Sequence, residues 1–175
     1  IGLTSREAQR LFQMDKPDYG HLFEHMSIVD GAEIAAERLI QPKIEGEIAL
    51  VLDRDLRGPG LTIADIVVAV DYVCGALEII DSRIENWKIK ACDTIADNGS
   101  SALYVLGPKK MALSGLDLPT IGMALSRNGE VLVTAAGAAV MGNPLNALVV
   151  AANELGRHNL NLRAGQVILT GSLGG

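Results

Sequence analysis

The stretch Ile44-Glu45-Gly46-Glu47-Ile48-Ala49-Leu50-Val51-Leu52 is the part of this chain on which fold and function most depend. A short β-branched and aliphatic run directly after a proline predicts a β-strand. Side chains alternate faces along a strand, so Glu45 and Glu47 lie on one face, about 7 Å apart. Burying two carboxylates without a counter-charge is costly. The pair therefore either faces water on an edge strand or binds a cation, and oxygen ligands suit Mg²⁺ or Mn²⁺.

Length and composition favour one ordered globular domain, since the chain has 175 residues, 49% of them hydrophobic, and a net charge of −6. The chain has no basic cluster and no apolar run of about 18 residues, which argues against nucleic acid or a membrane as partner. Cys74 and Cys92 lack metal-type spacing and are typical of reduced thiols in a cytoplasmic protein. The chain starts without Met, so we expect residues 1–175 to be a single catalytic domain lacking N-terminal and C-terminal parts.

Local signals predict an α+β fold with a mixed or antiparallel sheet. Asn128-Gly129 between two apolar runs predicts a two-residue hairpin. Asn143 and Pro144 are typical of a helix start, and Gly156 of its end. Ser5 is expected to cap a helix Arg6–Gln13 with Leu11 and Phe12 on its inner side. Further expected elements are a helix after Thr62, strands Ala102–Leu106 and Gln166–Thr170, and a turn Gly171–Gly175.

Glu78 interrupts the apolar run from Tyr72 to Ile80. A lone acid in such a run is more often paired with Arg or Lys than bound to metal. Three acids of this kind in one small domain shift that balance. Glu45, Glu47 and Glu78 together could form a three-carboxylate face that leaves positions open for water and substrate.

A rival motif is His21-Leu22-Phe23-Glu24-His25, which fits the inverted zinc-peptidase signature H-x-x-E-H. That chemistry needs a sustained helix presenting both imidazoles, and a third ligand. Turn residues on both sides of the segment argue against such a helix, and a five-residue pattern arises easily by chance.

Three segments together resemble a known family: Gln41–Ala49 (QPKIEGEIA), Ala76–Ile84 (ALEIIDSRI) and Asp93–Asn98 (DTIADN). The family is the fumarylacetoacetate hydrolase superfamily, and the resemblance extends over nearly the whole chain. Within the superfamily the chain is similar to the hydratase/decarboxylase branch of aromatic meta-cleavage catabolism, and most like its 2-hydroxypenta-2,4-dienoate hydratases. The resemblance implies a mixed, largely antiparallel β-roll or sandwich with few helices.

The resemblance also implies a site. Glu45, Glu47 and Glu78 would bind Mg²⁺ or Mn²⁺, which would chelate a small 2-oxo acid; Asp18 would be an acid/base group and Ser100 a site hydroxyl. The residues alone would place Asp18 and Ser100 in ordinary surface turns. The implied reaction is hydration of 2-hydroxypenta-2,4-dienoate to 4-hydroxy-2-oxopentanoate. Decarboxylation of 4-oxalocrotonate is the alternative within the branch.

A different class of function stays open, namely a non-catalytic partner subunit on the same fold, because the family usually carries a Lys directly before the position of Ile1. Further candidates for substrate contact are Lys90, Thr170, Ser172 and Arg83, the last either touching substrate or paired with Asp81 in the structure. We also expect a homo-oligomer, with another enzyme of the same pathway as a further partner.

Overall fold

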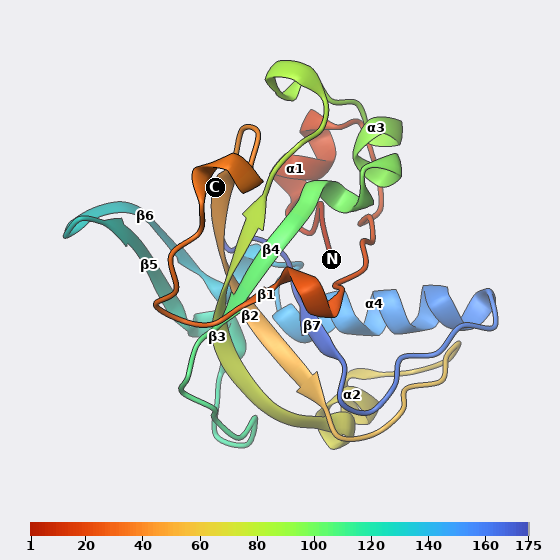
Figure 1. Cartoon of the computed structure of the whole chain (residues 1–175). Helices are drawn as coiled ribbons and strands as arrows, with labels where there is room; N and C mark the ends of the chain where they lie inside the picture. The colour runs from red at the N-terminus through yellow and green to blue at the C-terminus, as the bar shows by residue number, and fades with distance from the viewer. Residues whose placement is uncertain (175) are drawn as a thin grey trace.

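The computed structural model describes residues 1–174; Gly175, which ends the expected turn Gly171–Gly175, lies outside the described residues. Its centre is a five-stranded sheet in the order β1-β4-β3-β2-β7 (Figure 1). The strands are β1 (Ser27–Ile28), β2 (Lys43–Leu52), β3 (Val70–Ile80), β4 (Ser101–Leu106) and β7 (Val167–Leu169). β1 pairs with β4 in parallel, and the remaining pairs are antiparallel. The predicted α+β class with a mixed, largely antiparallel sheet is confirmed.

The two faces of β2 have different surroundings, as the alternation of side chains along Ile44–Leu52 predicts. Ile48, Leu50 and Leu52 point into the main core. Ala49, on the other face, belongs to a smaller apolar cluster. Helices α2 (Ile63–Ala69) and α4 (Pro144–Arg157) contribute buried side chains to the main core. The main core therefore fixes β2, and the face that carries the glutamates is left for a site.

A second, two-stranded sheet is formed by β5 (Gly122–Arg127) and β6 (Glu130–Ala136), which project to one side in Figure 1. Asn128 and Gly129 have φ of 53° and 83°, as a type I′ turn requires, so the predicted hairpin is confirmed. Met123 of this hairpin packs on β2, where a Cβ added at Gly46 would lie 3.1 Å from its sulfur. The glycine between the two glutamates therefore lets the hairpin approach the strand from the opposite face.

The helix ends agree with their sequence signals. The Asn143 side chain accepts the N–H of Leu145 at 3.0 Å to start α4. Ser5 caps α1 (Arg6–Leu11), and the remaining helix is α3 (Ala91–Ala96). The expectation that Leu11 points inward is wrong, since α1 has no buried residue and Leu11 is 78% exposed. Within residues 1–174, no helix has the length and apolarity that crossing a membrane requires.

Candidate metal centre

Strand register brings Glu45, Glu47 and Glu78 together. Glu45 of β2 lies directly opposite Glu78 of β3, and Glu47 is the next residue on the same face of β2. One carboxylate oxygen from each of the three lies within 4.8 Å of the others. No other group of three potential ligands of this kind is found among residues 1–174. β2 lies between β3 and β7, so the interpretation of the glutamate pair as part of a water-facing edge strand is wrong.

The carboxylates are poorly solvated. Glu47 is only 3% exposed; its Oε2 accepts the N–H of Gly171 at 2.6 Å. Its Oε1 is buried and has no hydrogen-bond partner in the described part of the chain. Burial, and then the charge of Glu78, raise the pKa of Glu45 to about 7. The same two causes, in the same order, raise the pKa of Glu47 well above its usual range.

These properties fit a divalent cation. A buried carboxylate oxygen without a donor normally has a reason, and an unseen ion is one of them. Three glutamate oxygens within reach of one another form a hard, oxygen-only donor set of the kind that Mg²⁺ and Mn²⁺ prefer. Neutralising this cluster would also remove the desolvation and like-charge costs that raise both pKa values.

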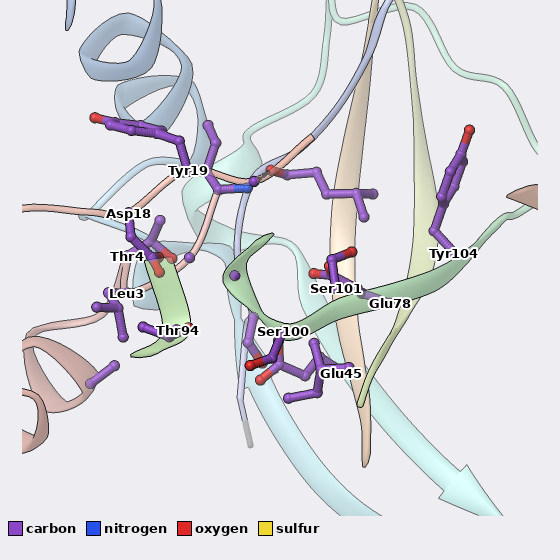
Figure 2. Close-up of a pocket in the computed structure, with 18 of the residues that line it drawn as sticks. Leu3, Thr4, Asp18, Tyr19, Glu45, Glu78, Thr94, Ser100, Ser101 and Tyr104 are labelled. Carbon is purple, nitrogen blue, oxygen red and sulfur yellow. Dashed lines mark hydrogen bonds between the residues drawn. The ribbon is translucent and has the colours of Figure 1, made fainter. Parts of the chain in front are cut away.

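The cluster opens into a cavity of about 1160 Å³. Its wall includes Glu45, Glu78, Asp18 and Ser100 (Figure 2), so the structure brings both sequence-predicted catalytic residues to the cavity that two of the three glutamates line. Figure 1 shows the corresponding end of the sheet next to α1 and α3.

Asp18 is a buried carboxyl group and not a surface turn residue. It is 5% exposed, and burial raises the pKa of its carboxyl group. Its backbone exchanges two hydrogen bonds with Gly2, and its Oδ1 is buried without a partner within residues 1–174. A Cβ at Gly2 would lie 2.2 Å from that oxygen, so only glycine fits against the carboxyl group. Asp18 can therefore hold or release a proton inside the cavity.

Ser100 ends an unusual turn. Asn98, Gly99 and Ser100 have φ of 58°, 68° and 56°, three consecutive left-handed residues. The Asn98 side chain fixes the turn to the N-terminal segment, accepting the N–H of His21 at 2.7 Å and donating to its carbonyl at 2.9 Å. The left-handed conformation costs a residue with a Cβ about 1–2 kcal/mol. Backbone strain of this kind clusters at functional sites.

The four other sequence candidates differ in position. Ser172 lines the cavity, and its hydroxyl donates to the Gly174 carbonyl at 3.1 Å. Thr170 is fully buried and donates to the Ile48 carbonyl at 3.0 Å, so its hydroxyl fixes β7 to β2. Lys90 precedes α3 and lines a second cavity of about 690 Å³.

Arg83 does not lie on the cavity wall, and its expected pairing with the carboxylate of Asp81 is wrong. Its guanidinium pairs with Asp97 (Nε to Oδ1, 3.4 Å) and reaches Asp81 only at the backbone carbonyl, at 3.2 Å. The Asp81 carboxylate is already used, because it accepts the N–H groups of Ile40 and Gln41 at 2.8 and 2.7 Å.

The histidine motif has a structure of its own. The Phe23 ring stacks on both His21 and His25, with centroid distances of 6.0 and 5.7 Å. The segment contains only a single 3-10 turn, Glu24–Met26. It therefore offers no helix that presents both imidazoles, and no histidine joins a three-ligand group within residues 1–174.

Two cavity residues were not anticipated from the sequence. Tyr104 of β4 lies directly opposite Glu78 and is 8% exposed. Ser101 is buried, and its Oγ has no partner among the described residues. Alternation along β4 gives a signal for Tyr104 once the register against β3 is known, but not for Ser101, which lies three residues earlier, beyond the register shift between Ile79 and Ile80.

The fold and the carboxylate cluster together match one family. The chain belongs to the fumarylacetoacetate hydrolase C-terminal family, whose family model matches residues 4–175.

Among its relatives is the 2-keto-4-pentenoate hydratase of Paraburkholderia xenovorans (strain LB400), 51% identical over 174 residues, which cover 99% of this chain and 65% of the relative. The 2-keto-4-pentenoate hydratase of Burkholderia vietnamiensis (strain G4 / LMG 22486) is 49% identical, with 99% and 66% covered. A solved structure of 4-oxalocrotonate decarboxylase from Pseudomonas putida G7, complexed with magnesium and adipate, superposes with a TM-score of 0.96 at 39% identity, covering 99% of this chain and 66% of that one. The chain thus spans 65 to 66% of the length of these relatives.

Proposed function

We propose that this chain carries the active site of a metal-dependent hydro-lyase, which adds water to 2-hydroxypenta-2,4-dienoate to give 4-hydroxy-2-oxopentanoate. The observation that carries the proposal is the convergence of Glu45, Glu47 and Glu78, because two of these residues, Glu45 and Glu78, line a cavity that is also lined by Asp18 and Ser100. The names of relatives at about half identity support the substrate.

Glu45, Glu47 and Glu78 would hold Mg²⁺ or Mn²⁺, as the magnesium complex of the decarboxylase relative suggests. When bound, such an ion supplies a Lewis acid that stabilises negative charge on the oxygens of a 2-oxo acid. The glutamates would hold that ion, and other residues of the cavity would handle protons and water.

The reaction needs two proton movements. Ketonisation removes the proton of the substrate 2-hydroxyl and places a proton on C5; addition then places water oxygen on C4 and a proton on C3. Asp18 is the proton carrier, because its buried carboxyl group has a raised pKa and keeps a protonated fraction closer to neutral pH. Ser100 orients the water, since its hydroxyl lies on the same cavity wall.

The test is turnover of the dienoate by the purified protein in Mg²⁺. Turnover is measured as loss of the diene absorbance and as appearance of the hydroxy-oxo acid. Asp18→Asn should lower kcat by about 10²–10⁴-fold, the usual contribution of a general acid/base. Turnover of the six-carbon diacid 4-oxalocrotonate alone, with release of CO₂, would refute the hydratase assignment.

Decarboxylation of 4-oxalocrotonate is the second candidate function. The superposition on a decarboxylase favours it, and the same glutamates would stabilise the dienolate left after loss of CO₂. A non-catalytic partner subunit is the third; retained Mg²⁺ affinity with no turnover of either acid would identify it. Assaying both acids side by side separates the three.

We further propose a cytoplasmic homo-oligomer. Both cysteines are free, as in reducing compartments. Large apolar side chains such as Val29 and Ile40 are 79% and 70% exposed, which supports a partner surface. Light scattering on the purified protein measures the subunit number, and a monomer would contradict this proposal.

A further inference from the structure

The Arg83–Asp97 ion pair surrounds the turn that carries Ser100. Besides the side-chain pair at 3.4 Å, the Arg83 backbone N–H donates to Asp97 Oδ2 at 3.1 Å. The guanidinium also donates from two nitrogens to the Ser101 carbonyl, at 3.4 and 3.3 Å. Arg83 thus contacts the chain on both sides of Ser100, at Asp97 before it and at Ser101 after it.

Ser100 itself has its backbone fully engaged. Its N–H donates to the Asp97 carbonyl at 2.9 Å, and its own carbonyl accepts the N–H of Asp81 at 2.8 Å. Asp81 follows β3 by one residue, and its carboxylate holds the chain just before β2. The short segment Asp81–Arg83 therefore ties the turn to both strands that carry the glutamates.

The hydrogen bond from the Ser100 side chain has a defined direction. Its hydroxyl lies 3.2 Å from Asp97 Oδ2, and an ionised carboxylate only accepts hydrogen bonds. Ser100 therefore donates its proton to Asp97, and the lone pairs of its oxygen remain free for the cavity. A hydroxyl oriented in this way accepts a hydrogen bond from water or from a substrate hydroxyl.

We propose that Arg83 and Asp97 are positioning residues that act through Ser100: the pair holds the left-handed turn and directs the Ser100 lone pairs to the water that adds to the substrate. This inference rests on the proposed function, because it assigns the oriented hydroxyl to the hydration step. It gives Arg83 a role behind the cavity wall and not against the substrate. Figure 2 shows Ser100 and Ser101 with Glu45 and Glu78 among the cavity residues.

The decisive experiment is a double-mutant cycle on dienoate turnover. Asp97→Asn should lower kcat by about 10–100-fold with KM changed less than about twofold, because an amide can donate to Ser100 and reverse its orientation. Arg83→Lys should lower kcat less than Arg83→Ala does, because lysine keeps the positive charge although it lacks the planar fork of the guanidinium. In a Ser100→Ala background, Asp97→Asn should cause no further loss. Additive losses would overturn the proposal.

The matched control is Asp55→Asn. Asp55 also pairs with an arginine, Arg163, at 2.8 Å and accepts a backbone N–H, that of Ala164, at 3.0 Å. It does not line the cavity. We expect wild-type kcat and KM for this variant.

Amide hydrogen exchange tests, without turnover, whether Arg83 and Asp97 act as a clamp, that is, whether they hold the turn that carries Ser100. Asp97→Asn, or Arg83→Lys if the first variant does not fold, should accelerate exchange at the amides of Ser100 and Asp81, whereas Asp55→Asn should not. Unchanged exchange at these amides would overturn the clamp. If the variants show accelerated exchange but the wild-type protein does not turn over the dienoate, the clamp is supported and only the proposed function is refuted.

Discussion

Replacing Glu47 by Gln should affect stability in opposite directions with and without metal. In wild type, one carboxylate oxygen from each of Glu45, Glu47 and Glu78 lies within 4.8 Å of the other two. With an effective dielectric constant of about 20, each ionised pair at that distance repels by about 3 kcal/mol. Glutamine removes one charge, and its carbonyl oxygen can still accept the Gly171 N–H. Because protonation already relieves part of the repulsion, we expect the metal-free variant to gain about 1–2 kcal/mol.

The assay is thermal unfolding at about pH 8, in EDTA and in excess Mg²⁺. A gain of this size raises the Tm by about 2–8 °C for a chain of this length. Saturating metal at about 100 times its Kd stabilises wild type by about 2.7 kcal/mol. Glu47→Gln should gain little stability from Mg²⁺. The variant therefore has the higher Tm in EDTA, and wild type has the higher Tm in Mg²⁺. Glu130→Gln, a change at an exposed residue of β6, is the control and should leave both Tm values unchanged. A Glu47→Gln protein that is less stable in EDTA and equally stabilised by Mg²⁺ would refute the reasoning.

Three other outcomes are expected. The pKa of Glu45 is raised from 4.5 to about 7, so between these values the Glu45 carboxyl binds more protons in the folded metal-free protein than in the unfolded chain. The stability that Glu45 contributes should be fully present below about pH 4.5 and be lost, by up to about 3 kcal/mol, as pH rises through 7. Urea unfolding in EDTA whose free energy rises over this range would contradict this. Gly156→Ala should destabilise by about 2 kcal/mol or more in the same assay, because the added Cβ would lie 2.1 Å from the carbonyl carbon of Gly58, whereas Gly122→Ala enters open space and should be neutral. His25→Ala should leave Mg²⁺ affinity unchanged in calorimetry, and loss of metal with this variant would revive the histidine motif.

Local chemistry was sufficient to predict several elements. Asn128-Gly129 can adopt the two left-handed conformations of a tight hairpin at little cost, so no distant contact is needed to specify it. Asn143 and Pro144 likewise start α4 through a cap and a fixed φ. The alternation of Glu45 and Glu47 against apolar neighbours gave the face of β2 on which the site lies.

Tertiary partners could not be predicted in the same way. Arg83 is two residues from Asp81 and fourteen from Asp97, and proximity in sequence favoured the wrong acid. The Asp81 carboxylate instead binds the backbone before β2, a contact that depends on how the segments pack. Leu11 was assigned inward on an apolar pattern, although α1 buries no residue.

The site itself required more than spacing. Three such acids in one small domain made a metal site plausible for Glu78, but only the resemblance to the family assigned all three to one ion, because no local rule gives the register between β2 and β3. Ser100 and Asp18 occupy turns that composition alone describes as solvent-exposed, yet both are buried. The contacts that hold these turns join segments distant in sequence, since Asp18 pairs with Gly2 and Asn98 pairs with His21.

The direct opposition of Glu45 and Glu78 gives the glutamates a role in sheet alignment. A slip of one residue between β2 and β3 would move Glu78 to the face that packs against the main core, and would separate it from Glu45. A cation bound by both strands would therefore penalise every misaligned pairing, in addition to its part in chemistry. The ligand set would then select a single register during folding, and metal affinity would measure how faithfully the two longest strands are paired.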